Sequence, residues 1–537
     1  PGCFKELRPG TSGFFKGHYD QSDQQASIHR QDQSVPDPEP ARFHEKIYRL
    51  TPTNQIVMTR TPSYLFSFLT IGLLVGLIAL NSLVVGVDVA SGSNNVIILM
   101  ASAIVIGFGI FRYKVTWQKI EKGIIHQVSE VVTSLVILLL IGGISGTWMI
   151  SGIVPMMTYY GVKLINPHFL LLSCTLTCAI VSLITGSSWT TVATIGLAFI
   201  GIGRSFGIHE GWVAGAIISG AYFGDKISPL SDTTNLAAII AGSDLMTHVK
   251  YMIYTTVPSL TITCIVYVIA NLNFMDINTI DMSATLNAID TTFNITPWLL
   301  IVPALTIVLI YFKVPTIILL FIIMMLGAVA AVIFQPEVCM HITGAAAMDW
   351  KSVYSSVVQS ISGTIQVPCD NPTFANFFIS RGMQGMLPTV MLIICALVFG
   401  GTISTIGVLD KLSQGIQKMC KGLTGTIVAL AFNGWLMNAV LFDQYLAIIL
   451  NTKIFKKNFE KLRLKPEVLS RSVEDATTVT SVLIPWNTCG LTQSAVLGVS
   501  TFAYFPFAVF CWISPLTTIV MVSLKIKLRQ VPLEDHT

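Results

Sequence analysis

Charged residues are scarce in this chain. Only 11% of its 537 residues are Asp, Glu, Lys or Arg, and 53% are hydrophobic, whereas a soluble domain carries about 25% charged residues. This composition excludes an ordinary soluble globule and a disordered chain. The formal net charge of +4 is small and the basic residues are scattered, so we expect no nucleic-acid partner. The chain is predicted to be an all-α polytopic membrane protein whose main surroundings are the lipid bilayer.

Motifs of metal sites and of common enzymes are also missing. The ten Cys residues include no CxxC pair, which excludes a zinc framework and a disulfide scaffold. No HExxH or GxSxG motif occurs, and no span holds two His residues. We therefore expect neither an enzyme nor a bound cofactor.

The segment 1–57 lacks the long apolar runs that follow it. It is polar and shows no signal peptide. We expect the natural start at Met58, with residues 1–57 not native; the alternative is a disordered cytoplasmic tail. The rest divides into a first transmembrane half (58–285), a second, inverted half (286–526) and a short cytoplasmic tail (527–537).

Basic residues orient the predicted spans. Lys and Arg concentrate in residues 112–122, 409–422 and 453–471, so these segments should face the cytoplasm. Residues 272–295 contain three Asp and no Lys or Arg and should face outward. The chain is thus expected to be a multi-pass protein of the cytoplasmic membrane, with both termini inside.

Two features recur in both halves at nearly the same spacing. The offset from Gly142-Gly143 to Gly400-Gly401 is 258, and the offset from Pro229 to Pro485 is 256. The corresponding spans have opposed orientations, which predicts an inverted-topology repeat with broken or re-entrant helices, a design of many secondary transporters. The alternative is coincidence, because Gly and Pro are common in membrane helices.

The first proline marks the densest group of polar residues in the apolar array. Asp225 and Asp232 lie two helical turns apart, and a charge inside the membrane is costly enough to indicate a function. Pro229 should break the helix and free the carbonyl group of Asp225. Carboxylate, hydroxyl and carbonyl oxygens suit a small hard cation, so we expect Na⁺ at Asp225 and Asp232. The other residues of this group are Lys226, Ser228, Thr233 and Asn235. The alternative is a helix end capped by Ser231 or Asp232.

The second proline has a similar polar setting. Glu474 precedes Pro485, and Asn487-Thr488 stands where Ser231-Asp232 stands in the first half. We expect these residues to take part in ion translocation; for Glu474 and Asp475 the alternative is pairing with the basic segment before them. Asp443, Ser187 and Ser188 complete the predicted path.

Asp443 has no cationic neighbour in sequence and should be protonated or cation-bound if it is buried. Ser187 and Ser188 should line the path, unless their hydroxyls bond to their own helix.

Several of these stretches resemble the NhaC-type Na⁺/H⁺ antiporter family. The matching stretches are SGAYFGDKISPLSDTTNLAA (219–238), GTWMISGIVPMMTYYG (146–161) and LSRSVEDATTVTSVLIPWNTCG (469–490). The resemblance covers about residues 65 to 525. It implies a secondary antiporter that exchanges Na⁺ for H⁺ across the cytoplasmic membrane.

Some members of the family also exchange carboxylates such as malate and lactate. This is the alternative function for the chain, with Lys226 or Arg204 holding the anion. The oligomeric state is left open, with a homodimer as one option.

Overall fold

The computed structural model describes residues 61–85, 92–273, 282–312, 314–369, 378–418 and 420–531. The segment 1–57 and the expected start at Met58 lie outside the described residues. So do residues 532–537 of the expected C-terminal tail.

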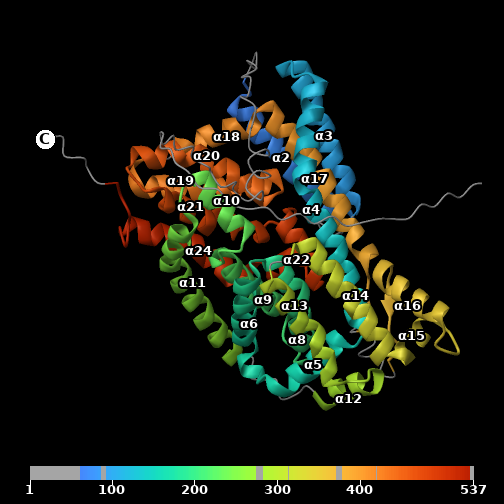
Figure 1. Cartoon of the computed structure of the whole chain (residues 1–537). Coiled ribbons are helices and arrows are strands. Elements are labelled where there is room, and N and C mark those ends of the chain that lie inside the picture. The colour runs from blue at the N-terminus through green and yellow to red at the C-terminus, as the bar shows by residue number, and fades with distance from the viewer. Residues whose placement is uncertain are drawn as a thin grey trace, which may run out of the picture. The chain divides into compact units, whose positions relative to one another are not determined.

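The described chain is almost entirely helical (Figure 1). Its α-helices, in chain order, are α2 (Tyr64–Val85), α3 (Gly92–Tyr113), α4 (Trp117–Ile150), α5 (Ile153–Leu164), α6 (Leu170–Thr185), α7 (Ser188–Thr191), α8 (Leu197–Ser205), α9 (Glu210–Ile227), α10 (Asp232–Ala241), α11 (Leu245–Asn273), α12 (Met282–Thr292), α13 (Ile301–Tyr311), α14 (Thr316–Phe334), α15 (Pro336–Thr343), α16 (Trp350–Ser362), α17 (Leu387–Ile406), α18 (Val408–Gln417), α19 (Gly422–Leu441), α20 (Gln444–Lys461), α21 (Pro466–Val473), α22 (Thr488–Leu497), α23 (Thr501–Tyr504) and α24 (Val509–Ser523).

Shorter elements join these helices. Two π-helical turns, η2 (Val192–Gly196) and η7 (Glu474–Thr478), continue α7 and α21. The 3₁₀ turns are η1 (Pro167–Phe169), η4 (Pro297–Leu300), η6 (Met383–Met386), η8 (Ser481–Leu483) and η9 (Phe505–Phe507). The short strands β1 (Ile365–Gln366) and β2 (Ile379–Ser380) pair antiparallel, with Ile365 opposite Ser380.

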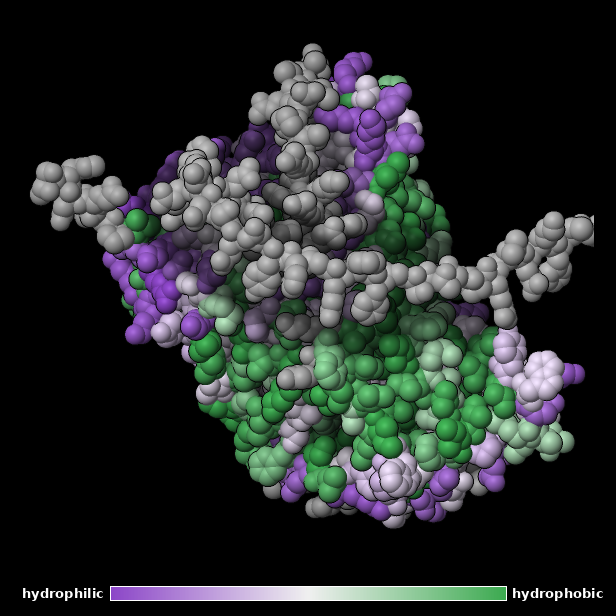
Figure 2. All heavy atoms as spheres, viewed as in Figure 1, coloured by the Kyte–Doolittle hydropathy of each residue, from purple (hydrophilic) through white to green (hydrophobic). Residues whose placement is uncertain are grey.

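The surface of the helical part has the pattern of a membrane protein. Among the described residues, eight helices are long and apolar enough to cross a bilayer, or up to ten if two bent helix pairs each count as one span. Figure 2 shows hydrophobic residues over the middle of the visible face and hydrophilic residues toward its upper and lower ends. The polytopic all-α prediction is confirmed.

The basic and acidic segments lie at opposite ends of the helical array. In Figure 1, α18 and α20, which carry parts of two basic segments, lie toward the upper end, and α12, from the acidic segment, lies at the lower end. This arrangement agrees with the charge pattern, which places the two kinds of segment on opposite sides of the membrane.

The offset between Pro229 and Pro485 recurs in the helix boundaries of the two halves. Helices α6 and α19 end at Thr185 and Leu441, α9 and α21 begin at Glu210 and Pro466, and α10 and α22 begin at Asp232 and Thr488. Left-handed backbone conformations recur with the same offset, in the pairs Gly186 and Phe442, Gly207 and Arg463, and Gly242 and Gly498. The spacing first seen for the two prolines therefore extends over the local structure of both halves.

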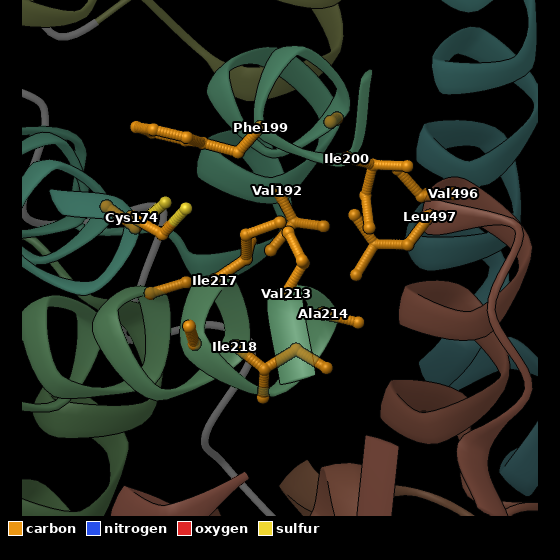
Figure 3. Packing of buried hydrophobic residues seen from close by; sticks show 14 of the residues in the cluster. Cys174, Val192, Phe199, Ile200, Val213, Ala214, Ile217, Ile218, Val496 and Leu497 are labelled. Atoms are coloured by element: carbon orange, nitrogen blue, oxygen red, sulfur yellow. The ribbon is translucent and has the colours of Figure 1, made fainter. Parts of the chain in front are cut away.

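The largest apolar core joins helices from both halves. Figure 3 shows Val213 and Ile217 of α9 near Val192 of η2, with Val496 and Leu497 of α22 beside them. All five side chains belong to one buried cluster, so the core fixes the first half's broken helices against a helix of the second half.

Candidate ion-binding site

Helix α6 ends at a break that positions the next helix. Gly186 adopts a left-handed conformation (φ +66°), which glycine reaches at little cost. Ser187 then caps α7, because its hydroxyl accepts a hydrogen bond from the Thr190 N–H at 3.2 Å. This break turns the N-terminus of α7 toward α9.

Close packing brings α9 against α6. A Cβ atom at Gly220 would lie 2.2 Å from the Thr175 carbonyl oxygen, and one at Gly224 would lie 2.4 Å from the Ala179 carbonyl oxygen. Only glycine permits this approach of two backbones. The residue after Gly224 is Asp225, which is thereby carried to the break.

Asp225 is bound to the N-terminus of α7. The Ser188 N–H and the Ser188 hydroxyl both donate to its Oδ2, at 3.0 and 2.6 Å. These charge-assisted bonds offset part of the cost of a buried carboxylate. Ser188 therefore contacts the Asp225 carboxylate and does not line the cavity described below.

The other hydroxyls of this segment behave differently. Thr191 Oγ1 donates to the Ser187 carbonyl oxygen and Thr194 Oγ1 to the Thr190 carbonyl oxygen, at 2.9 and 2.8 Å. These two hydroxyls therefore bond to the carbonyl groups of their own helix and do not reach Asp225.

The break at Pro229 differs from the expected one in one respect. Helix α9 ends at Ile227 before the proline, and the Asp225 carbonyl oxygen accepts from the Ser228 N–H at 3.2 Å. The Thr234 hydroxyl donates to the Lys226 carbonyl oxygen at 2.8 Å. The expectation of a freed Asp225 carbonyl was therefore wrong, because the turn itself supplies donors for the end of the helix.

Ser231 caps α10, as the alternative interpretation held. Its hydroxyl accepts from the Thr234 N–H, and Asp232 is the first residue of the helix. A carboxylate in this first turn is favoured by the helix dipole. Capping and a role for Asp232 are compatible, because its side chain also reaches a cavity.

Both aspartates line one cavity of about 110 Å³. Asp225 is buried, at 9% exposure, and Asp232 is exposed, so the two mark its inner and outer parts. The remaining lining residues are Ser134, Ile137, Thr185, Gly186, Ser187, Trp189, Leu230, Ser231, Thr233, Thr316, Gln444 and Tyr445. The cavity is large enough for several water-sized species.

The donor set of this cavity fits a hard monovalent cation better than a transition metal. Two carboxylates, several hydroxyls and one amide offer oxygen ligands. Among the described residues, no group of three or more His, Cys, Asp and Glu side chains is placed to hold a metal ion. Asp225, Asp232 and Thr233 are therefore the predicted residues best placed for Na⁺.

Three other predicted residues of this break point elsewhere. Ser228 donates to the Leu183 carbonyl oxygen at 2.8 Å, and Asn235 Nδ2 donates to the carbonyl oxygens of Pro229 and Ser231. These two residues hold the turn, so both have a supporting place. Lys226 turns away from the cavity and is fully buried against Asp475.

The corresponding break of the second half holds Asp443, Asn487 and Thr488 together. Asp443 caps α20, accepting from the Leu446 N–H at 3.0 Å, and Thr488 Oγ1 lies 3.5 Å from its Oδ2. Asn487 caps α22, and its Nδ2 donates to the Asn438 carbonyl oxygen at 3.0 Å. All three side chains are buried, and none lines the cavity of Asp225.

Contacts at the two breaks recur with the offset of the two prolines. Ser182 donates to the Ala221 carbonyl oxygen, and Asn438 to the Thr477 carbonyl oxygen. The contact of Ser188 with Asp225 has its counterpart in Ser481, which donates to the Gln444 amide oxygen at 3.2 Å. The two halves thus share a scaffold but carry their carboxylates at different positions.

Glu474 and Asp475 differ from each other in their surroundings. Asp475 pairs with Lys226 and lies 3.8 Å from Arg471 Nε. Neither oxygen of Glu474 has a hydrogen-bond partner among the described residues, although the side chain is fully buried. The alternative of pairing with preceding basic residues thus holds in part for Asp475 and not for Glu474.

A second cavity, of about 690 Å³, includes Pro485 in its lining. It contains Arg204 and Arg381 together with the hydroxyls of Ser145, Ser380 and Ser494. Arg204 also pairs with Glu210 at 2.7 Å. Of the two residues suggested for an organic anion, Arg204 faces a cavity, whereas Lys226 does not.

Sequence reasoning did not assign Gln444 and Tyr445 to the first site. Both come from the second half, and Gln444 directly follows the Asp443 cap. Polar residues directly after a helix cap in an otherwise apolar span are the signal that could have identified them.

The chain is similar to known antiporters over most of its length. Residues 220–526 match the sequence profile of the Na⁺/H⁺ antiporter family. The Na⁺/H⁺ antiporter NhaC of Alkalihalophilus pseudofirmus is 35% identical over 85% of this chain and 94% of its own length. NhaC of Bacillus subtilis is 33% identical over 80% of this chain and 90% of its own length.

A third relative is named for a different exchange. The malate-2H⁺/Na⁺-lactate antiporter of Bacillus subtilis is 34% identical over 74% of this chain and 82% of its own length. The resemblance to the NhaC-type family found in the sequence is thus confirmed over both halves. The chain belongs to the Na⁺/H⁺ antiporter family.

Proposed function

We propose that this chain exchanges Na⁺ for H⁺ across the cytoplasmic membrane, and that Asp225 and Asp232 bind the transported ions. The observation that carries the proposal is that both carboxylates line one small cavity, at the ends of α9 and α10. The cavity lies where two broken helices meet, which is the usual place of the ion site in repeat-built transporters.

Exchange follows from electrostatics in this arrangement. Two carboxylates that share a site cannot both ionise at low cost unless a cation lies between them. Na⁺ entering the cavity would compensate both charges and allow a proton to leave. A proton returning to one carboxylate would weaken the hold on Na⁺, so the two ions compete for the same oxygens.

The N-termini of α7 and α10 support this role. They present the Ser188 N–H to Asp225 and the first turn of α10 to Asp232. Both favour the negative charge that a cation needs. The ammonium group of Lys226 does not compete, because it is held by Asp475 and Ser514 outside the cavity.

The proposed orientation places the basic segments 112–122, 409–422 and 453–471 in the cytoplasm. The Lys- and Arg-rich end near α18 and α20 would then be the inner end, and the end near α12 the outer one (Figure 1).

The proposal is tested with purified protein in liposomes that contain a pH-sensitive dye. A Na⁺ gradient alone should move protons, and the same gradient of choline should not. Li⁺ and K⁺ in place of Na⁺ then define the cation preference. Absence of Na⁺-driven proton movement in oriented, folded protein would reject the proposed function.

Exchange of small carboxylates is a second candidate, favoured by the cavity that Arg204 and Arg381 line. Guanidinium groups bind carboxylates in a bidentate manner. Malate and lactate added to the same liposomes decide between the two. Full Na⁺/H⁺ exchange without either acid supports the first function, and a strict requirement for one of them supports the second.

A further inference from the structure

A group of charged residues lies buried outside the ion cavity. Asp475 is its centre: Lys226 Nζ and the hydroxyls of Ser514, Thr255 and Thr518 all donate to its carboxylate. With four donors on two oxygens, Asp475 is a satisfied anion. It has a structural partner in Lys226, which belongs to the other half of the chain.

Glu474, the neighbouring residue, has no such partners. Its side chain is 0% exposed, and neither carboxyl oxygen accepts or donates a hydrogen bond among the described residues. The Thr478 hydroxyl, at the end of the same π turn, is a buried polar neighbour of this carboxyl, but its geometry is not that of a hydrogen bond. An ionised carboxylate without donors is strongly disfavoured in such surroundings, so this geometry is that of a protonated carboxyl.

The same surroundings also hold charge that can compensate the ionised form. Arg471, three residues earlier, is fully buried, and Nε, Nη1 and Nη2 of its guanidinium group have no hydrogen-bond partner among the described residues. The group lies 4.3 Å from the centre of the Tyr251 ring. Lys226 and Arg471 carry two positive charges, against the negative charges of Asp475 and, when it is ionised, of Asp225. Once Na⁺ compensates Asp225, ionisation of Glu474 would balance the group.

The charged neighbours of Glu474 come from few elements. Its carboxyl interacts electrostatically with Asp225 and Lys226 of α9 and with Asp475 beside it. Helix α19, which packs on η7, carries no ionisable side chain. Of the other helices against η7, α10 carries Asp232, α20 carries Tyr445 near the break, and α24 carries Cys511. His248 of α11 bonds to Ser470 through Nδ1 at 2.7 Å.

The charged residues Arg471, Glu474 and Asp475 have no charged counterparts in the first half. At the corresponding positions of the first half, Gly215, Ile218 and Ser219 stand where Arg471, Glu474 and Asp475 stand in the second half. The first half thus forms the same break without any of these charges, so they are not needed to build it.

We infer that Glu474 binds a second transported proton, at a site separate from the Na⁺ cavity. The inference rests on the proposed function. Burial favours the protonated carboxyl, and the positive charges of Lys226 and Arg471 favour the ionised one once Na⁺ compensates Asp225. A carboxyl group whose surroundings stabilise both the protonated and the ionised form can bind and release a proton. The proton leaves the carboxyl for water, and the carboxylate left behind is compensated by the two cations.

The covalent chain links this site to the cavity. Asp225 and Lys226 are adjacent at the end of α9, and Lys226 binds Asp475, which is adjacent to Glu474. A cation that draws Asp225 into the cavity therefore also displaces Lys226, which pairs with Asp475. Na⁺ binding and proton release at Glu474 are coupled by this path, and the coupling must be reciprocal.

The test counts the protons released when purified protein binds Na⁺, by calorimetry in buffers of different ionisation enthalpy. Glu474→Gln keeps the shape of the side chain and removes its titration. The variant should bind Na⁺ and release about one proton fewer per bound Na⁺ than the unmodified protein. Glu467→Gln is the matched control, because Glu467 lies in the same helix but pairs with Arg529 at the surface end, and it should release the unmodified number.

Either of two results overturns the inference: a folded Glu474→Gln variant that releases as many protons as the unmodified protein, or one that no longer binds Na⁺. The second result would place Glu474 in the cation site. If the unmodified protein neither binds Na⁺ nor releases protons, it is the proposed function that fails. Should Glu474→Gln not fold, Glu474→Asp keeps a titratable group. It should shift the pH dependence of proton release and not the number released, and an unchanged pH dependence would contradict the inference.

Discussion

Ser188 and Thr194 are both hydroxyl residues on the same broken helix, but only Ser188 reaches the carboxylate of Asp225. The Ser188 hydroxyl donates to the Asp225 carboxylate at 2.6 Å, whereas the Thr194 hydroxyl bonds to its own helix. Side-chain type alone does not distinguish them. Their positions relative to the helix cap distinguish them. Ser188 is the first residue of α7 and reaches Asp225 beyond the helix end, whereas Thr194 lies further along, in η2.

This difference makes a prediction for Na⁺ affinity. Ser188→Ala removes one hydrogen bond to a charged group, worth about 1.5–3 kcal/mol, so the Na⁺ concentration for half-maximal exchange should rise about tenfold or more. Thr194→Ala is the control and should leave it unchanged. The dye assay in liposomes measures both, and equal effects in the two variants would contradict the role given to Ser188.

The buried pair of Lys226 and Asp475 makes a prediction for stability. Lys226→Met leaves Asp475 without its main charge partner, which should cost about 3–5 kcal/mol. Adding Asp475→Leu removes the stranded charge and should restore part of the loss. Arg529→Met, which breaks the partly exposed pair with Glu467, should cost no more than about 1 kcal/mol.

Thermal unfolding in detergent measures these variants. A double variant that is less stable than Lys226→Met alone would show that Asp475 is stabilised by its hydroxyl donors and not by the lysine.

At the scale of elements, the close packing of α6 and α9 carries Asp225 to its place. Gly224→Ala would put a methyl group 2.4 Å from the Ala179 carbonyl oxygen, so the helices must separate. We expect a loss of about 1–3 kcal/mol of stability and impaired exchange. Gly107→Ala in α3 has nothing within 4 Å of its added carbon and should be tolerated. A Gly224→Ala variant with normal thermal stability and exchange would contradict the account of this packing.

The broken helices show how far local sequence determines structure. Pro229 and Pro485, with the polar residues around them, were enough to predict both breaks, and the alternative interpretation of Ser231 as a helix cap also holds. The cap at Asn487 was not predicted. The pairing of Lys226 with Asp475 was not predictable, since the two residues are 249 positions apart and meet through packing between the halves. For the same reason Gln444 and Tyr445 were not assigned to the cavity. Asp225 and Asp232 could be predicted as partners because they lie on two consecutive helices.

At the scale of the molecule, one constant offset relates the two halves in helix boundaries, left-handed turns and hydrogen bonds. We predict that the halves have opposite orientations in the membrane. In a cysteine-free background, His209→Cys and Lys465→Cys occupy corresponding positions in the turns before α9 and α21. A membrane-impermeant thiol reagent should label the Lys465→Cys variant only from the cytoplasmic side and the His209→Cys variant only from the opposite side. Labelling of both variants from one side would contradict an inverted repeat.

The central claim is that Asp225 and Asp232 exchange Na⁺ for H⁺ in one cavity, and it is tested most directly with Asp232→Asn in liposomes. Asn preserves shape and one oxygen acceptor, so the protein should fold, while the titrating charge is lost and Na⁺-driven proton movement should disappear. Asp244→Asn is the control, because the Asp244 carboxylate accepts from the Thr247 N–H in an exposed turn, and its exchange should match that of the unmodified protein. Near-normal exchange and Na⁺ affinity in Asp232→Asn would contradict the account and move the ion site to the second break, at Asp443 and Thr488.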